Sequence, residues 1–269
     1  MMYYKSILIC GGDKRQKYMY EYMREKGLDV STFGLFYGDL ENLEDIRKFD
    51  VIILPVPVTR DGVYLNSKRV IKLEDIFKYV SKTQIVLGGM YDGIIDYFKC
   101  EKLQMKNALP TAEGAIQVAM ENTDITINGS KCGVFGYGRI GKILSNMLKN
   151  MDADVTVFAR KEKDLALAEA LGYNTENIYF KSGFSDFDII FNTVPETFLD
   201  SDALGTTKND VILIELASKP YGIDFESAEK LGRKCVLASG LPGKVAPKTA
   251  GKILYDVIMD ILGGIENGT

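Results

Sequence analysis

The sequence of 269 residues contains no histidine and no tryptophan. Histidine is the side chain that most often acts as a general base near neutral pH, activates serine or cysteine nucleophiles, and binds metal ions. Its absence excludes Ser-His and Cys-His catalytic pairs and removes the commonest metal ligand. Any acid or base in this chain must therefore be a lysine, aspartate, glutamate, tyrosine or cysteine.

Cysteines are few and widely separated: Cys10, Cys100, Cys132 and Cys235. Three of them lie in apolar segments with β-strand character, which favours buried thiols over disulfides or a zinc site. We therefore expect no bound metal.

Long apolar runs and basic stretches are also missing. Residues 51–54 form one of the longest apolar runs and are far too few to span a membrane, and residues 7–10 are too few for a signal peptide. A hydrophobic fraction of 46%, a charged fraction of 26% and a net charge of -4 are typical of a globular protein that does not bind nucleic acid. We expect a cytoplasmic protein without a membrane or nucleic-acid partner.

Strand-like and helix-like segments alternate along the chain, as in α/β proteins with parallel sheets. The pattern predicts an α/β fold with two doubly wound parallel-sheet domains and a cleft between them. The predicted division is a flavodoxin-like α/β domain over residues 1–110, a bridging helix over 111–122, a second α/β domain over 123–246, and a C-terminal helix over 247–269. The apolar face of that last helix could return to the first domain. Predicted strands lie over 6–10, 51–54, 84–87, 154–158, 188–191, 211–215 and 234–237, and predicted helices over 14–26 and 73–80.

A glycine-rich run follows an apolar strand-like stretch and opens a helix-like segment. In such a G-x-G-x-x-G pattern the first glycine permits a tight turn, the second lets the backbone approach a pyrophosphate, and the third lets helix and strand pack closely. The helix N-terminus then faces the negative charge. The run predicts a dinucleotide site formed by Gly136, Tyr137, Gly138, Arg139, Ile140 and Gly141. Residues 123–246 are therefore predicted to be a Rossmann NAD(P)-binding domain, which leaves residues 1–110 as the substrate domain.

The next strand-like run ends about 20 residues after the glycines, where the adenosine ribose is recognised. An NAD site usually has a carboxylate there, whereas this sequence has Arg160 and Lys161. Two cations fit a 2'-phosphate, so we predict NADP, with NAD as the alternative; the pair could also begin a solvated helix. Thr193, Val194 and Pro195 follow a later strand at the ligand-binding edge and are predicted to flank the coenzyme.

Two further positions could bind a substrate. The run from Gly11 to Arg15 lacks the third glycine, so the predicted ligand is a small anion such as a carboxylate, held by backbone donors and Arg15. Asp13 is predicted to belong to the same substrate site, and a plain exposed helix turn is the alternative. Thr111 and Glu113, at the start of the bridging helix, could serve the substrate or a hinge, in competition with simple helix capping.

Besides the Gly11 to Arg15 run, the chain contains several longer motifs: Leu54-Pro55-Val56-Pro57, Asn107-Ala108-Leu109-Pro110-Thr111-Ala112-Glu113-Gly114-Ala115, Leu216-Ala217-Ser218-Lys219-Pro220 and residues 240–251. Together these motifs resemble one family, the A-subunits of dipicolinate synthase, over nearly the whole chain. The resemblance implies an enzyme that works with a flavoprotein-like B-subunit in sporulating bacteria and oxidises dihydrodipicolinate to dipicolinate (pyridine-2,6-dicarboxylate) with a nicotinamide coenzyme. One departure is Tyr221, which stands where glycine is expected.

The layout also resembles D-2-hydroxyacid dehydrogenases, and this second resemblance indicates where the chemistry lies. The places of that family's catalytic arginine and histidine hold Lys219 and Lys248 here. Two ammonium groups suit a dicarboxylate substrate, so we favour them as carboxylate anchors; Lys248 as proton acceptor is the alternative. A D-2-hydroxyacid dehydrogenase variant and a non-catalytic NADP-sensing module remain alternative functions. We expect a hetero-oligomer with the flavoprotein-like B-subunit and self-association as a homo-oligomer.

Overall fold

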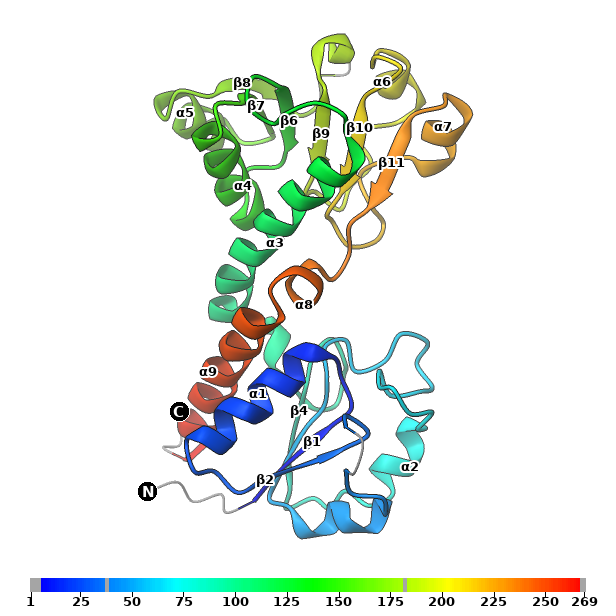
Figure 1. Cartoon of the computed structure of the whole chain (residues 1–269), viewed down its shortest axis with the longest axis vertical. Coiled ribbons are helices and arrows are strands. Elements are labelled where there is room, and N and C mark those ends of the chain that lie inside the picture. Colours follow the sequence, from blue (N-terminus) through cyan, green and yellow to red (C-terminus); the bar gives the residue numbers. More distant parts are fainter. Residues whose placement is uncertain (1–5, 37–38, 181–182, 267–269) are drawn as a thin grey trace. The chain divides into compact units, whose positions relative to one another are not determined.

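The computed structural model describes residues 6–36, 39–180 and 183–266 and divides into two compact units. Unit 1 combines residues 1–107 with 246–269, and unit 2 comprises residues 108–245. Each unit is built on a single parallel sheet flanked by helices (Figure 1). The predicted α/β class with two parallel-sheet domains is therefore confirmed.

Unit 1 contains a five-stranded sheet of order β2-β1-β3-β4-β5, with every neighbouring pair parallel. Numbered along the chain, this is the flavodoxin-like order. Side chains of β1 alternate between two cores, Ile7 and Ile9 in one and Leu8 and Cys10 in the other, as a sheet buried on both faces requires. The elements are β1 (Ile7–Cys10), α1 (Lys14–Glu25), β2 (Val30–Phe33), η1 (Leu43–Lys48), β3 (Val51–Ile53), α2 (Leu73–Phe77), β4 (Ile85–Gly88), β5 (Ile95–Asp96), η2 (Tyr97–Lys99) and α9 (Pro247–Glu266).

The C-terminal helix α9 packs along α1 within unit 1 (Figure 1). Its apolar residues Leu254, Val257 and Ile258 share a core with Met19 and Met23 of α1. Helices α1 and α9, which lie far apart in the sequence, thus contribute to the same core of unit 1.

Unit 2 contains a six-stranded parallel sheet of order β11-β10-β9-β6-β7-β8. Counted from the other edge, this is the Rossmann order 3-2-1-4-5-6. One face carries an aromatic core in which the rings of Phe135 and Phe158 stack with centroids 4.3 Å apart. The elements are α3 (Glu101–Asn122, shared with unit 1), β6 (Lys131–Phe135), α4 (Arg139–Asn150), β7 (Asp154–Ala159), α5 (Glu162–Ala170), β8 (Asn174–Asn177), η3 (Phe184–Asp186), β9 (Ile189–Asn192), α6 (Ser201–Gly205), β10 (Ile212–Glu215), α7 (Phe225–Lys230), β11 (Lys234–Leu237) and α8 (Leu241–Val245).

The start predicted for the bridging helix is wrong. Helix α3 begins at Glu101 and carries Pro110 in its interior, although proline removes a helical hydrogen bond and costs about 3 kcal/mol there. Burial on both sides of the proline outweighs this cost: Leu103 packs in a core of unit 1, and Ala115 and Ala119 pack in a core of unit 2. Local propensity is therefore overridden by tertiary packing.

Candidate functional site

The glycine turn of unit 2 has the tight geometry that its sequence predicts. Gly136 lies at φ +96°, a left-handed value that favours glycine, and an added Cβ would collide with the hydroxyl of Thr193. At Gly141 an added Cβ would overlap the carbonyl oxygen of Gly136. Helix α4 can approach strand β6 this closely only because both residues lack a side chain.

Gly138, the second glycine of the turn, faces open space. An added Cβ at Gly138 would have no heavy atom within 4 Å, and the residue is exposed. Gly138 is also the N-cap of α4 and supplies no side-chain acceptor to the first N–H groups of that helix. These groups and the positive end of the helix dipole suit a pyrophosphate, so the residues present fit a dinucleotide.

The three side chains between the glycines differ in their surroundings. Tyr137 is only 5% exposed, packs edge-on against Tyr173 at 6.2 Å, and has its pKa raised by burial. Ile140 is half-buried and Arg139 is exposed. The Tyr137 ring is thus a core residue, and only its backbone is available to a ligand.

Arg160 and Lys161 lie directly after strand β7, and both side chains are exposed. The guanidinium of Arg160 is 3.8 Å from the carboxylate of Glu196, which is also exposed. A solvated pair of this kind contributes little free energy and exchanges readily for another anion. Sequence reasoning did not select Glu196, because the pairing joins segments far apart in the chain.

The loop after strand β9 is fixed by its own polar side chains. Thr193 is half-buried, and its hydroxyl donates a hydrogen bond to the carbonyl of Phe135 (2.8 Å). The Asn192 amide donates to the carbonyl of Val194 (2.9 Å), while Pro195 is exposed. This loop therefore lies against the glycine turn, to which the Thr193 hydroxyl binds it.

Glu215, the last residue of β10, is fully buried and was not selected from the sequence. Its carboxylate accepts hydrogen bonds from the Asn192 amide (2.7 Å) and from the backbone N–H groups of Ala217 (2.8 Å), Gly222 (2.9 Å) and Ile223 (3.0 Å). Burial raises the pKa of Glu215, and these donors oppose the rise. A charged residue directly after four apolar residues, 211–214, was the signal available in the sequence.

Lys219 lies on the loop that Glu215 holds, and its side chain is exposed. On the same loop Tyr221 adopts φ +69°, the left-handed conformation that glycine would take at no steric cost. Its ring packs edge-on against Phe225 at 5.5 Å. Tyrosine therefore keeps a glycine-like backbone here, and contacts around the loop compensate for it.

In unit 1, Asp13 and Arg15 are hydrogen-bonded to each other and to the surrounding backbone. Asp13 is the N-cap of α1 and accepts from the Arg15 N–H (2.8 Å), while the Arg15 guanidinium binds the Asp13 carboxylate (2.8 Å) and the carbonyl of Val56 (2.7 Å). The Arg15 side chain is only 13% exposed. The structure therefore gives this pair a capping and bracing role before any ligand binds.

The remaining residues that were predicted to contact the substrate lie on helices. Thr111 and Glu113 are in the middle of α3, so neither caps that helix as the capping alternative supposed. Thr111 is half-buried and Glu113 is exposed. Lys248 is exposed in the first turn of α9, directly after Pro247, and no acidic residue shares that turn.

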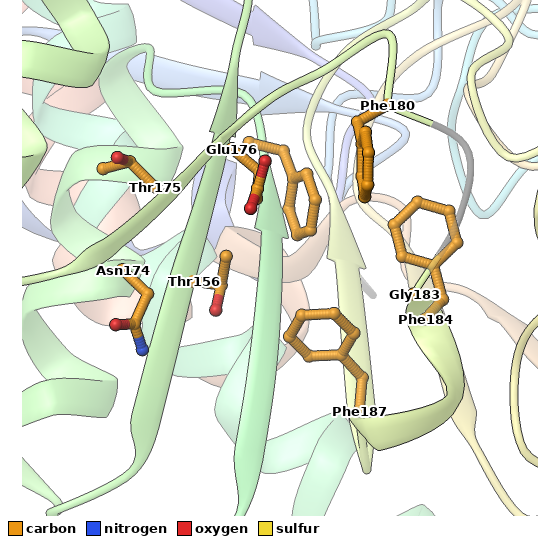
Figure 2. Close-up of a pocket in the computed structure, with 9 residues that line it drawn as sticks. Thr156, Asn174, Thr175, Glu176, Phe180, Gly183, Phe184 and Phe187 are labelled. Carbon is orange, nitrogen blue, oxygen red and sulfur yellow. The ribbon is translucent and has the colours of Figure 1, made fainter.

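Unit 2 also has a pocket of about 370 Å³ beside β7 and β8 (Figure 2). No residue predicted to bind coenzyme or substrate is among those known to line it. Its walls combine aromatic side chains, among them Phe158, Phe184 and Phe187 of the aromatic core, with polar residues of β8. They are Thr156, Phe158, Asn174, Thr175, Glu176, Phe180, Gly183, Phe184 and Phe187.

Within the described ranges, no cluster of three or more cysteine and carboxylate side chains is placed to bind a metal. Burial raises the pKa of Cys132 to about 11 and that of Cys235 to about 12, so both thiols are neutral near pH 7. None of the helices within these ranges has the length and apolarity that a membrane crossing requires.

Comparison with known proteins first gives the class. Residues 102–219 match the family model for the D-isomer specific 2-hydroxyacid dehydrogenase NAD binding domain. The fold also matches D-lactate dehydrogenase from Escherichia coli at 15% identity, with a TM-score of 0.60 and coverage of 98% of this chain and 97% of that one. With the Rossmann strand order and the glycine turn, these matches define an oxidoreductase that uses a nicotinamide coenzyme.

The family follows from matches over nearly the full length. Residues 6–106 match the N-terminal domain of the dipicolinate synthase A-subunit. The chain is 33% identical to the dipicolinate synthase A-subunit of Bacillus subtilis (strain 168), covering 97% of this chain and 96% of that protein. The crystal structure of the dipicolinate synthase A-subunit from Bacillus halodurans matches with a TM-score of 0.87 and 31% identity, covering 96% of this chain and 97% of that one. This chain therefore belongs to the dipicolinate synthase A-subunit family, and the resemblance inferred from its motifs is confirmed.

Proposed function

We propose that this protein is the NADP-dependent oxidoreductase component of a dipicolinate synthase, which oxidises dihydrodipicolinate to dipicolinate during sporulation. The observation that carries this proposal is the full-length match to A-subunit relatives, together with an open glycine turn at the N-terminus of α4. The alternative of a D-2-hydroxyacid dehydrogenase has less support, because no histidine is available for its proton transfer.

The coenzyme is proposed to bind along the carboxyl edge of the unit 2 sheet. The first N–H groups of α4 would hold the pyrophosphate, and Gly138 leaves room for it. Arg160 and Lys161 would bind the 2'-phosphate, with Arg160 exchanging Glu196 for the stronger anion. When bound, the nicotinamide supplies the hydride acceptor of the reaction.

The substrate is a dicarboxylate, and the proposed anchors are lysines. Lys219 is exposed on a braced loop, and Lys248 adds its charge to the positive end of the α9 dipole. Fixed cations can orient a substrate, and orientation alone supplies about 7 to 11 kcal/mol of a barrier, so a strong general base is not essential. Asp13, Arg15, Thr111 and Glu113 remain proposed substrate contacts.

Activity tests this proposal directly. Purified protein mixed with a flavoprotein-like B-subunit should convert dihydrodipicolinate to a product with the absorbance of dipicolinate, and NADP should be consumed in step. Lys219→Ala and Lys248→Ala should each raise the KM for substrate, while Lys230→Ala, an exposed lysine paired with Glu226, should not. Loss of substrate no faster than in buffer, with either coenzyme, would contradict the proposal.

Coenzyme choice is tested separately by titration. Arg160→Ala should weaken NADPH binding far more than NADH binding, because only NADPH carries the 2'-phosphate. Glu196→Gln should strengthen NADPH binding, because the competing carboxylate is removed. Equal losses for both coenzymes in Arg160→Ala would remove the argument for NADP.

Assembly is the remaining part of the proposal. We expect a hetero-oligomer with the B-subunit and self-association of this chain. Light scattering of the purified protein, by itself and mixed with the B-subunit, measures both masses; a monomer that does not change on mixing would contradict this expectation.

A further inference from the structure

The buried carboxylate of Glu215 connects two loops of unit 2. Its Oε1 accepts from the Asn192 amide and from the N–H of Ala217, and its Oε2 accepts from the N–H groups of Gly222 and Ile223. Ala217 and Gly222 lie on either side of Lys219 in the chain. One side chain therefore holds both ends of the loop that carries Lys219.

Asn192 extends this network to the neighbouring strand. The same Nδ2 that binds Glu215 also donates to the carbonyl of Val194, and Asn192 Oδ1 accepts from the Val194 N–H (3.2 Å). Between these two residues, Thr193 binds the carbonyl that precedes the glycine turn. Glu215 is thus connected through one amide to the loop of residues 193–195.

The hydrogen-bond network around Glu215 leaves no room for a side chain at residue 222 and requires a carboxylate at residue 215. An added Cβ at Gly222 would collide with the Asn192 amide. Four N–H donors point at the two oxygens of a residue that is 0% exposed, and a buried charge is tolerated only when its hydrogen bonds are satisfied in this way. A glutamine would present an NH₂ group to donors and leave two of them unpaired.

We propose that Glu215 is a positioning residue that couples the coenzyme loop, residues 193–195, to the substrate loop that carries Lys219. The inference rests on the proposed function, which assigns the two loops to coenzyme and substrate. Glu215 touches neither ligand; it acts through Asn192 on one loop and through backbone N–H groups on the other. Loss of its charge therefore loosens both loops at once.

The test compares coenzyme affinity and turnover in the full-length protein. Glu215→Gln should raise the Kd for NADPH by about tenfold or more and also lower kcat, because displacement of a bound group by about 1 Å can cost a hundredfold. Glu226→Gln is the matched control, since this glutamate lies on the surface of the same unit and pairs only with Lys230 among the described contacts. Lys219→Ala should leave the Kd for NADPH unchanged and raise the KM for substrate.

Asn192→Ala separates positioning from a loss of folding, since it keeps the carboxylate and its three backbone donors. It should raise the Kd for NADPH, and the double variant Asn192→Ala/Glu215→Gln should bind no more weakly than Glu215→Gln alone. Wild-type NADPH affinity in both single variants, with only a lower midpoint of urea unfolding, would overturn the inference. Failure of the wild-type protein to bind any nicotinamide coenzyme would overturn the proposed function as well, so the two failures are distinguishable.

Discussion

At the residue scale, the glycines of the coenzyme turn have different physical roles. Gly141→Ala places a methyl group on the Gly136 carbonyl oxygen, so α4 must move away from β6, and overpacking of this kind costs about 1–3 kcal/mol. Gly138→Ala meets no atom within 4 Å and should cost less, below about 1 kcal/mol, because alanine is only a poorer N-cap than glycine. Both variants should bind NADPH more weakly. Urea unfolding measures the two stability losses, and NADPH titration measures the two affinities. Equal stability losses in the two variants would contradict the different roles of these glycines.

The N-cap of α7 allows a prediction about pH. The Asp224 carboxylate accepts from the Ser227 hydroxyl (2.6 Å) and N–H (3.1 Å), and these hydrogen bonds lower the pKa of Asp224. A lowered folded-state pKa means that the stabilisation is present above the unfolded pKa of about 4 and is lost as pH falls through the folded pKa. Asp224→Ala should cost about 1 kcal/mol at pH 7 and progressively less in acid.

Urea unfolding at a series of pH values measures this difference. Glu229→Ala, on the exposed side of the same helix, is the control and should show no such trend. A cost of Asp224→Ala that is the same at pH 7 and at pH 3 would show that the charge of this cap does not matter.

At the element scale, the contact between α1 and α9 depends on one small residue. An added Cβ at Gly251 would lie 2.6 Å from the Arg15 carbonyl oxygen and 2.7 Å from the Tyr18 Cβ, so Gly251→Ala must push the two helices apart. We expect a loss of about 1–3 kcal/mol. Gly263→Ala on the same helix has open space and should stabilise it by up to about 1 kcal/mol. Thermal unfolding followed by circular dichroism distinguishes the two, and the prediction fails if both shifts have the same sign.

Elements were predictable from sequence where local pattern and tertiary context agree. Strand β6 with its glycine turn was found because apolar strand, glycines and amphipathic helix occur together. Strand β8 was missed because its sequence, Asn174-Thr175-Glu176-Asn177, is entirely polar, as an edge strand can be. The predicted start of helix α3 is ten residues late because proline favours the first turn of a helix, so Pro110 indicated a start there. Only burial in both units explains why the helix runs through Pro110.

At the scale of the whole molecule, unit 2 is continuous in sequence and unit 1 is not. Residues 108–245 include both cores of the Rossmann sheet, so this segment expressed alone should fold and bind NADPH as the full chain does. Removal of residues 246–269 should unfold unit 1, because Leu254, Val257 and Ile258 leave its core. Circular dichroism and NADPH titration of the two fragments test this. A 1–245 fragment whose circular dichroism shows unit 1 still folded without α9 would contradict it.

The sequence by itself determined the fold class, the dinucleotide turn and the family, because each is written in residues close together in the chain: alternating apolar runs, three spaced glycines and short motifs. The tertiary structure decided what depends on distant partners. Only folding places Asn192 beside Glu215, Glu196 beside Arg160, and Gly251 against α1. The physical reason is that burial and hydrogen-bond geometry are set by the neighbours that the fold supplies, and a single sequence does not name those neighbours.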